Sequence, residues 1–263
     1  MQDKIPVTVI VTTLNEEKNL GRCLSSLSRF DEVVIVDSGS LDDTREIAES
    51  YGVYFFDFRW NGQYPKKRQW CLDTLPLKHD RVFFVDADEE VTSALAQEIS
   101  ALDWNAGGYF IKGLYVVDGK TLHFGLSNQK LCLFDRRKMT FPVVDDLDIS
   151  GMGEIEGHYQ PVFKAGAGIV KSLKKPILHH ALDDRQRYAD RHVGYAQWHR
   201  VMNAREAYPQ DPVFSRQTLK TIFQALPFKR TVFFLYYYFW RGGILEFRNH
   251  SEIFRQKCRF YGI

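Results

Sequence analysis

The residues of this 263-residue chain best suited to chemistry are Asp86 and Asp88, which a single alanine separates. Two carboxylates at that spacing can hold one divalent cation, and Mg²⁺ or Mn²⁺ usually shares its ligand shell with substrate phosphates. The apolar run 82–85 precedes them and is typical of a strand buried on both faces of a parallel sheet. The acids are therefore expected where that strand leaves the sheet, at the edge where open α/β sheets bind ligands. The alternative is a polar strand end that caps the following helix.

Two more predicted strands also end in polar residues. The first strand, a β-branched run, ends in Thr12 and Thr13, and the second, residues 32–36, is followed by Asp37 and Ser38. Because the carboxyl ends of parallel strands meet at one edge of a sheet, these side chains are expected to converge with the Asp-Ala-Asp turn. One polar strand end can arise by chance, whereas three at one edge predict a binding site.

Strands alternate with helices over the first part of the chain. Helices of about a dozen residues between strands specify right-handed βαβ units and a parallel sheet. Asn15 is expected to be the N-cap of the first helix, and Glu89 and Glu90 are expected to open the helix after the fourth strand. The glycine-rich sequences of dinucleotide-binding folds and P-loop NTPases are missing, which counts against both classes. Strands are predicted at residues 7–13, 32–36, 53–56 and 82–85, then from 107 and from 130, with a loop over 116–129.

Composition places the chain among ordinary globular proteins, with 44% hydrophobic and 26% charged residues. Its four cysteines show no paired CxxC spacing and are expected to be free thiols in a reducing compartment. The net charge of +2 hides an asymmetry between the two parts of the chain. Residues 1–163 carry 17 basic against 26 acidic side chains, and residues 164–263 carry 18 against 7. This division predicts a cation-binding catalytic part followed by a part that meets anionic partners.

Four sequence motifs, in this order, resemble the family 2 glycosyltransferases with the GT-A fold. Within that family they are most similar to the bacterial branch that builds lipopolysaccharide cores and exopolysaccharides. The resemblance implies an α/β domain over residues 1–180, with a mostly parallel central sheet flanked by helices, and a helical C-terminal region over 181–263. The motifs are Val-Ile-Val-Thr-Thr-Leu-Asn-Glu-Glu (9–17), Val-Val-Ile-Val-Asp-Ser-Gly-Ser-Leu-Asp-Asp-Thr (33–44), Lys-Lys-Arg-Gln-Trp (66–70) and Phe-Val-Asp-Ala-Asp-Glu (84–89).

The same resemblance implies a nucleotide-diphosphate sugar as donor, with UDP as the expected nucleotide, and Mn²⁺ or Mg²⁺ as cofactor. Asp88 would be the principal metal ligand, and Asp86 would face the ribose or a metal-bound water. His179 would complete the metal shell or contact the diphosphate. Asp37 would accept a hydrogen bond from the base, and Arg68, with Lys67, would face the base or the phosphates. The residues expected to hold the donor are Thr12, Thr13, Asn15, Glu16, Asp37, Ser38, Lys67, Arg68 and Asp86.

Transfer with inversion also needs a carboxylate that removes the proton of the acceptor hydroxyl. Relatives carry an acid in a motif such as Val-His-Glu at the corresponding point, which favours Glu156. Glu154, Asp145 and Asp146 are the other candidates, and Glu154 would share a face with Glu156 if this segment were a strand. The alternative is a set of surface acids in a glycine-containing loop.

From residue 183 the chain is predicted to be helical. The uncharged run 231–240 is too short to span a bilayer, but its Tyr and Trp content and the flanking Lys229, Arg230 and Arg241 are typical of an interfacial segment. A buried helix that covers the sheet is the alternative. We therefore expect a peripheral protein at the cytoplasmic face of a bacterial membrane, with a saccharide or lipid-linked saccharide acceptor and no nucleic-acid partner.

The rival enzyme class is a sugar-phosphate nucleotidyltransferase, which also pairs an α/β sheet with carboxylate-bound Mg²⁺. Such an enzyme would normally have a glycine-rich basic loop after the first strand, and residues 12–17 contain none. The non-enzymatic rival is a degenerate sugar- or membrane-binding module. That class predicts the loss of Asp37, Asp88 or the late carboxylate, and all three positions are filled.

Overall fold

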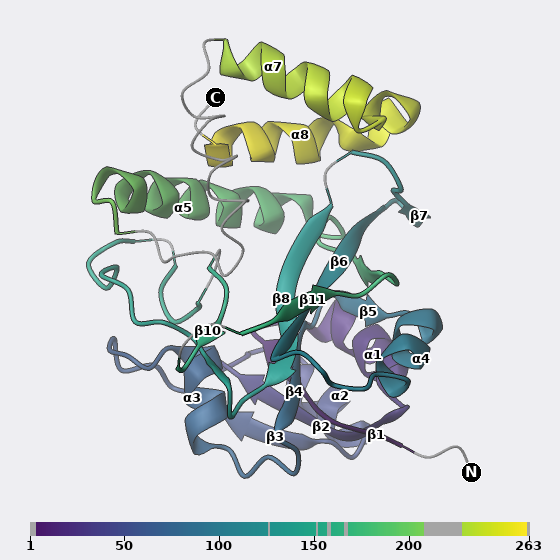
Figure 1. Ribbon diagram of the computed structural model, residues 1–263, viewed down its shortest axis with the longest axis vertical. Coiled ribbons are helices and arrows are strands. Elements are labelled where there is room, and N and C mark those ends of the chain that lie inside the picture. Colours follow the sequence, from purple (N-terminus) through teal and green to yellow (C-terminus); the bar gives the residue numbers. More distant parts are fainter. Residues whose placement is uncertain are drawn as a thin grey trace.

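A ten-stranded mixed sheet forms the centre of the protein in a computed structural model (Figure 1). The structure describes residues 4–125, 127–150, 152–156, 159–165, 168–207 and 228–261. The strands are β1 (Ile5–Thr13), β2 (Phe30–Asp37), β3 (Tyr54–Asp57), β4 (Arg81–Asp86), β5 (Glu89–Val91), β6 (Gly108–Val117), β7 (Lys120–Thr121), β8 (Asn128–Asp135), β9 (Met139–Thr140), β10 (Val162–Phe163), β11 (Val170–Ser172) and β12 (Ile177–His179). The helices are α1 (Glu17–Ser26), α2 (Thr44–Ser50), α3 (Lys67–Thr74), α4 (Ser93–Ser100), α5 (Arg185–Ala204), α7 (Lys229–Leu235), the π-helix η1 (Tyr236–Trp240), the 3₁₀-helix η2 (Gly243–Glu246) and α8 (Phe247–Tyr261).

The first four strands form the predicted parallel sheet, in the order β3-β2-β1-β4. The apolar side chains of β1, β2 and β4 are mostly buried, as in a sheet covered on both faces, whereas the edge strand β3 has no buried residue. The register brings polar strand ends together: Thr12 lies opposite Asp86, and Thr13 lies opposite Asp37. The predicted convergence at one edge of the sheet is therefore confirmed.

Beyond β4 the sheet becomes mixed. Strand β8 pairs antiparallel with β4 and β6, and β12 pairs parallel with β6 and antiparallel with β5. The prediction that Glu89 and Glu90 open a helix is wrong, because both belong to β5, where Glu89 lies opposite His179. Helix α4 begins only after Thr92, whose hydroxyl caps it by accepting a hydrogen bond from the Leu95 amide at 3.1 Å.

Two other local predictions also fail. Asn15 is not the N-cap of α1, since it has a φ of 54° and its side-chain oxygen accepts a hydrogen bond from the Leu41 amide at 2.8 Å. Asn tolerates this left-handed conformation, so the residue joins two loops and α1 starts two positions later. The loop expected over 116–129 contains ordered strand, because β6 extends to Val117, β7 follows, and β8 starts at Asn128.

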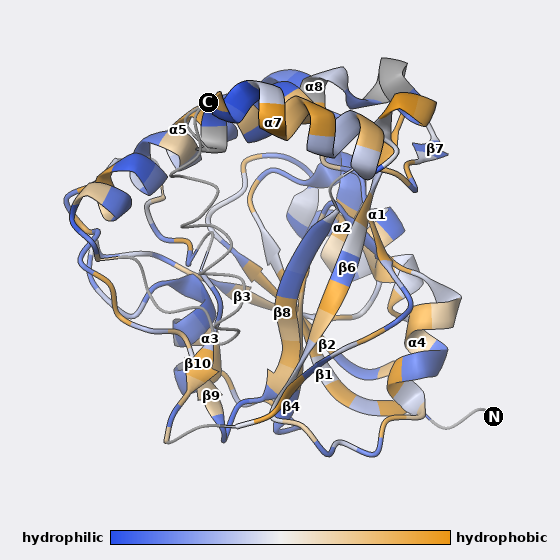
Figure 2. Cartoon of the chain, turned by 45° about the horizontal axis from the view of Figure 1, so that its top comes forward, coloured by the Kyte–Doolittle hydropathy of each residue, from blue (hydrophilic) through white to orange (hydrophobic). Residues whose placement is uncertain are grey.

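The C-terminal helices α5, α7 and α8 form a layer across one end of the sheet (Figure 1). One small apolar cluster joins Tyr115 of β6 to this layer, through Tyr188 of α5, Phe233 and Tyr237. A second cluster packs Trp198 of α5 against the loop after β9. Figure 2 shows that β8 is hydrophobic in the part that runs through the sheet and hydrophilic where it approaches this layer, which matches its burial.

Two further features follow from the sequence. All four cysteines are free and buried, as expected from their spacing. Within the described part of the chain, no helix is long and apolar enough to cross a membrane. The proposed division at residue 180 stays a prediction.

Candidate active site

The loop after β2 is organised by the carboxylate of Asp37. This carboxylate accepts hydrogen bonds from the hydroxyls of Thr13 (2.7 Å) and Ser40 (2.5 Å), and from the amides of Gly39 (2.8 Å) and Ser40 (2.7 Å). Gly39 has a φ of +89°, a conformation that glycine adopts without strain. Asp37 is 2% exposed, so its buried carboxylate shapes the loop after β2 and ties it to the end of β1 through Thr13.

Asp86 ends β4 between two cationic side chains. Its carboxylate accepts from Arg68 Nη2 of α3 at 3.1 Å and from Lys130 Nζ of β8 at 2.7 Å. Lys130 also forms an ion pair with Glu89 at 2.6 Å, and Glu89 accepts a hydrogen bond from the Asp86 amide at 3.0 Å. Burial raises the pKa of Asp86, but Lys130 and Arg68 more than offset this and hold that pKa well below its usual range. The cluster fixes the shape of the turn that also carries Asp88.

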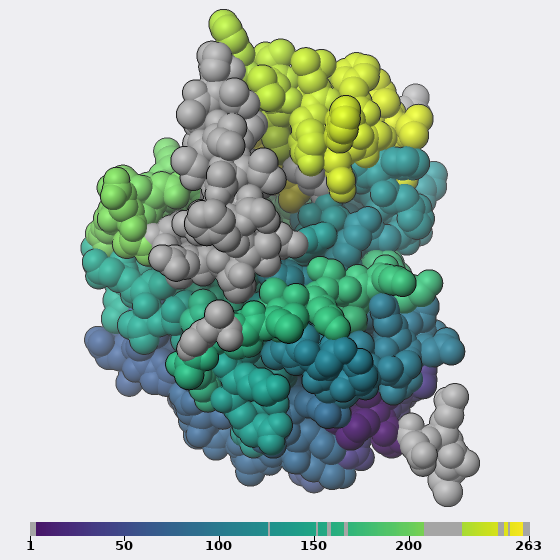
Figure 3. All heavy atoms as spheres, viewed as in Figure 1, coloured from purple at the N-terminus to yellow at the C-terminus, as the bar shows by residue number. Residues whose placement is uncertain are grey.

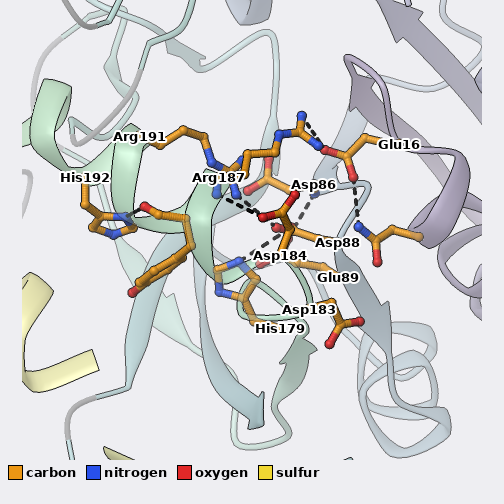
Figure 4. Close-up of polar contacts among 12 residues, drawn as sticks. Glu16, Asp86, Asp88, Glu89, His179, Asp183, Asp184, Arg187, Arg191 and His192 are labelled. Carbon is orange, nitrogen blue, oxygen red and sulfur yellow. Dashed lines mark hydrogen bonds and ion pairs between the residues drawn. The ribbon is translucent and has the colours of Figure 1, made fainter. Parts of the chain in front are cut away.

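Asp88 faces His179, which the β5–β12 pairing carries to it (Figure 4). His179 Nε2 lies 3.5 Å from Asp88 Oδ1, and the His180 amide donates to the Asp88 carbonyl at 2.8 Å. Burial lowers the pKa of His179, but the Asp88 carboxylate outweighs burial and raises that pKa to about 9. The other ring nitrogen, Nδ1, is buried without a hydrogen-bond partner in the described residues, and the ring stacks on Tyr115 with centroids 5.3 Å apart.

Helix α5 adds two arginines from one face, four residues apart (Figure 4). Arg191 Nη2 lies 3.7 Å from Asp88 Oδ2. Arg187 donates to the carbonyls of Leu14 (2.6 Å) and Asn15 (3.0 Å), and its Nη2 lies 3.0 Å from Glu16 Oε1. Arg187 thus anchors α5 to the loop after β1, while Arg191 reaches the acid cluster with a longer, looser contact.

Two of the four candidate bases lie away from these residues. Asp146 is fully buried, and its carboxylate accepts hydrogen bonds from Tyr64 Oη, Lys66 Nζ and Trp198 Nε1, all at 2.8 Å. Its partners hold the loop after β9 against α5, which is a structural role. Asp145 is 86% exposed, and its nearest cation is Arg205 at 3.9 Å. Neither carboxylate therefore forms a hydrogen bond or ion pair with the residues around Asp86 and Asp88 in the described part of the chain.

The other two candidates contact α3 and β2. Residues 152–156 form a turn and an irregular segment, so the strand alternation considered for Glu154 and Glu156 does not apply. Glu154 forms an ion pair with Lys67 at 2.7 Å and accepts a hydrogen bond from the Ser38 hydroxyl. Its contacts place it beside the end of β2.

Glu156 lies at the N-terminus of α3. Its carboxylate accepts hydrogen bonds from the amides of Arg68 (2.8 Å) and Gln69 (2.9 Å), two donors that lack a partner within the helix. The residue is 1% exposed, and its burial raises the pKa of its carboxyl group. Through Arg68, which also donates to Asp86, Glu156 is linked to the acid cluster.

The structure therefore gathers most of the predicted residues at one edge of the sheet. Thr12, Thr13, Asp37 and Ser38 lie at the ends of β1 and β2, and Asp86, Asp88, His179 and Arg68 lie around the end of β4. Lys67 is buried against Glu154 and does not face Asp86, and Asn15 and Glu16 bond to neighbouring loops and to α5. The residues that sequence reasoning missed are Glu89, Lys130, Arg187 and Arg191. For Lys130 a signal existed, since it is a charged residue that enters a buried strand.

Asp88 and His179 fit a divalent cation by donor type and separation. Two ligand atoms that each bind one ion at about 2.1 Å lie about 3 Å apart. The observed distance of 3.5 Å between His179 Nε2 and Asp88 Oδ1 is close to this value. The unpartnered Nδ1 shows that the imidazole is not committed to a second protein group in the described residues. Those residues contain no group of three or more His, Cys, Asp or Glu side chains that could hold a metal ion. A cation bound here would draw its other ligands from substrate and water, as Mg²⁺ usually does.

Comparison with known proteins identifies one family. The sequence profile described as Glycosyl transferase family 2 matches residues 8–153. A lipopolysaccharide core biosynthesis glycosyltransferase, LpsC of Rhizobium meliloti, is 36% identical over 107 residues, which cover 39% of this chain and 38% of the relative. An uncharacterized glycosyltransferase of Rickettsia typhi is 30% identical over 146 residues, 51% of this chain and 48% of the relative. The chain thus spans less than half the length of these relatives.

Solved structures give weaker likenesses. TarS 1–349 of S. aureus matches over 97% of this chain and 88% of that protein, with 15% identity and a TM-score of 0.47. Glucosyl-3-phosphoglycerate synthase of Mycobacterium tuberculosis, solved with Mn²⁺, UDP and glucosyl-3-phosphoglycerate, matches 42% of this chain and 44% of its own. That match has 25% identity and a TM-score of 0.32.

Proposed function

Because this chain belongs to glycosyl transferase family 2, we propose that it transfers a sugar from a nucleotide-diphosphate sugar to a saccharide acceptor in lipopolysaccharide or exopolysaccharide assembly. The parallel β3-β2-β1-β4 sheet with its flanking helices is the GT-A architecture that the motifs implied. The observation that carries the proposal is the pairing of Asp88 with His179 at the carboxyl edge of that sheet, with Arg68 and Arg191 beside it. A carboxylate and an imidazole with guanidinium groups beside them suit a cation and a diphosphate together.

The donor, a UDP-sugar in this proposal, lies along the ends of β1, β2 and β4. The nucleoside is held at the loop that Asp37 and Thr13 shape, and the diphosphate reaches towards Asp88. Arg68 and Arg191 both reach this edge, where they contact Asp86 and Asp88, and a guanidinium carries five N–H donors. Arg187 keeps α5 in place and thereby positions Arg191 over the acids.

Asp88 and His179 are the residues that would hold a divalent metal ion, Mn²⁺ or Mg²⁺. When bound, that cation would stabilise the negative charge that develops on the leaving diphosphate. Asp86 faces the same site, but Lys130 and Arg68 already occupy its oxygens, so we assign it to shaping the turn and to the ribose side of the donor.

The reaction proceeds with inversion in this proposal, and Glu156 is the general base. A carboxylate has about four lone-pair positions, and the α3 amides use two of them. The remaining positions can take the proton from the hydroxyl of the acceptor saccharide. Burial raises the pKa of Glu156, which makes the carboxylate a stronger base than an exposed one. Glu154 is the second candidate, although Lys67 and Ser38 engage its carboxylate at the β2 end.

The acceptor is lipid-linked in this proposal, and α7 with η1 contacts the membrane surface at its cytoplasmic face. One side of this segment is buried through Phe233, Tyr237 and Tyr238. The opposite side is exposed and apolar, with Phe239 at 59% and Trp240 at 83%. Figure 2 shows hydrophobic bands along α7, and Figure 3 shows the segment on the outer surface of the molecule. A half-buried segment with an apolar outer side and flanking basic residues suits an interfacial position.

A donor screen tests the transfer reaction. The intact protein is incubated with a panel of nucleotide sugars and Mn²⁺, and release of nucleoside diphosphate is measured together with thermal shift. One class of donor should stabilise the protein and be turned over, and Asp88→Asn should abolish the turnover. Asp73→Asn, an exposed acid on α3, is the matched control and should behave as wild type. Turnover that survives Asp88→Asn, or no response to any nucleotide sugar, contradicts the proposal.

A further inference from the structure

Helix α8 carries a lysine, Lys257, on the side that packs against β6. Lys257 follows Ile253 by four residues and Phe254 by three, so the three side chains share one face of the helix. Ile253 and Phe254 are buried in the apolar cluster that also contains Tyr115 of β6. Lys257 is half-buried, and its Nζ lies over the Tyr115 ring, 5.7 Å from the ring centroid. A face that otherwise serves packing therefore carries a cation.

The ammonium group of Lys257 has no acidic partner. Among the residues that the structure describes, its Nζ forms no hydrogen bond and no ion pair. The cations already assigned to the candidate active site differ in this respect, because Lys130, Arg68 and Arg191 each pair with a carboxylate. An aromatic ring attracts an ammonium group but leaves its three N–H donors to be satisfied by water or by a ligand. Lys257 is therefore the cation of this region that remains open to an anion.

Tyr115 connects Lys257 with the candidate metal site. In the pairing of β6 with β12, Tyr115 lies opposite His179, and the two rings stack with centroids 5.3 Å apart. His179 Nε2 in turn lies 3.5 Å from Asp88 Oδ1. One aromatic ring therefore links Lys257 to the two proposed metal ligands.

The ring of His192 on α5 lies within reach of the same positive charge. Burial lowers the pKa of His192, and the charges of Lys257 and Arg191 lower it further. Arg191 is also the residue whose guanidinium lies 3.7 Å from Asp88 Oδ2. Lys257 and Arg191 thus act from two helices of the C-terminal layer on the same part of the molecule.

The strand order indicates which part of the donor Lys257 would meet. The sheet runs β2-β1-β4-β8-β6-β12, so β6 and β12 lie on the far side of β4 from β1 and β2. In the proposed function the nucleoside lies at the ends of β1 and β2, and the diphosphate reaches towards Asp88 after β4. The terminal phosphate, which carries the sugar, is then the part of the diphosphate nearest to β6 and β12. An ammonium group binds phosphate oxygens as a compact charge with three donors.

We propose that Lys257 binds the terminal phosphate of the nucleotide-diphosphate donor. This inference rests on the proposed function and adds to its site a residue of α8, the last described helix of the chain. The alternative is a lysine that only packs its aliphatic stem on Tyr115 and extends its charge to solvent.

Nucleotide binding by the intact protein in the presence of Mn²⁺ tests the assignment. Titration calorimetry measures the affinities for UDP and for UMP, which lacks the terminal phosphate. Lys257→Met keeps an aliphatic stem beside Tyr115 but has no charge. It should lose about tenfold or more in UDP affinity, because a hydrogen bond between two charged groups is removed. Its affinity for UMP should stay within about twofold of wild type.

Two further variants separate phosphate binding from packing and from general charge. Lys257→Arg keeps a cation at this position and should retain most of the UDP affinity. Arg259→Met is the matched control, since it removes a positive charge from an exposed position of the same helix. It should change the affinities for UDP and UMP by less than about twofold.

Four results would overturn the role of Lys257. They are an unchanged UDP affinity in Lys257→Met, an equal loss for UMP, an equal loss in Arg259→Met, and a Lys257→Arg variant as weak as Lys257→Met. The last of these would identify packing on Tyr115 as the cause. A wild-type protein that binds no UDP would contradict the proposed donor, and this assignment with it. Wild-type UDP binding that Lys257→Met leaves unchanged would contradict this assignment alone.

Discussion

Lys130 and Glu89 form an ion pair of 2.6 Å between Nζ and Oε1, directly beneath the turn that carries Asp86 and Asp88. Glu89 is buried, and Lys130 also donates to Asp86 at 2.7 Å, so one lysine compensates two carboxylates. Burial lowers the pKa of Lys130, but these two acids more than offset that effect and raise it above its usual range. The Lys130–Glu89 pair therefore holds the turn that carries Asp86 and Asp88, and we assign it no contact with a substrate.

The first prediction concerns this pair. Lys130→Met should lower the free energy of unfolding by about 3–5 kcal/mol, because it leaves a buried carboxylate without its partner. Urea denaturation measures the change. Lys78→Met is the matched control, since Lys78 forms an ion pair of the same 2.6 Å length with Asp31 but is largely exposed. This substitution should change the free energy of unfolding little. Equal effects of the two substitutions would contradict the structural role of Lys130.

Adjacent histidines provide the second prediction. His179→Ala should weaken Mn²⁺ binding and donor turnover by at least about 10- to 100-fold, because it removes one of the two proposed protein ligands. His180→Ala removes a ring that lies 3.1 Å from Glu90 instead, and should leave Mn²⁺ affinity within a few-fold of wild type. Titration calorimetry with Mn²⁺ separates the two variants. Wild-type affinity in the His179 variant would exclude this residue as a ligand.

The third prediction separates the base from the helix cap. Glu156→Gln should lower transfer by about 10²–10⁴ while donor affinity stays near wild type. It should also cost about 1–2 kcal/mol of stability, because the α3 amides lose a charged acceptor. Glu154→Gln is the matched control, and its rate of transfer should fall by only a few-fold. A loss of stability without a loss of transfer would leave Glu156 as a cap and move the base to Glu154.

The fourth prediction concerns pH and His192 of α5. Its Nδ1 donates to the Tyr188 carbonyl at 2.7 Å, and burial lowers the pKa of His192 to about 4. The folded state therefore keeps the ring neutral down to about pH 4, whereas the unfolded chain takes up a proton below about pH 6.5. Because only the unfolded chain takes up this proton, the free energy of unfolding should fall by up to about 3 kcal/mol as the pH drops from 6.5 to 4.

His192→Asn tests that prediction, because its amide keeps an N–H donor and cannot titrate. The variant should lose less stability than wild type between pH 7 and pH 4, as measured by urea denaturation at each pH. His123→Asn, at an exposed position, should lose as much as wild type. An identical pH response of the His192 variant and wild type would show that this ring does not titrate in that range.

The fifth prediction concerns the membrane. Phe239→Ser/Trp240→Ser should weaken vesicle flotation by about tenfold or more, since each substitution removes an exposed aromatic side chain proposed to insert. The control is Leu41→Ser/Tyr54→Ser, which removes two exposed apolar side chains far along the chain. Equal flotation of both variants and wild type would exclude the α7–η1 surface as the contact.

The sequence by itself determined the parallel sheet and the position of its acids. Apolar runs that end in polar residues imply strands whose carboxyl ends meet, and Thr13, Asp37 and Asp86 do meet there. Local turn chemistry was less decisive. Asn15 and Glu89 both follow strands, and contacts with distant segments, not local propensity, decided their conformations.

Only the tertiary structure decided which charges compensate those acids. Lys130 meets Asp86 from 44 residues away, and Glu156 caps α3 from 88 residues away, because strand pairing and loop packing bring them there. No sequence period encodes such pairings. The same holds for α5, whose Arg191 reaches Asp88 on a helix that Arg187 ties to the loop after β1. The sequence thus located the site, and long-range packing selected the cations around it.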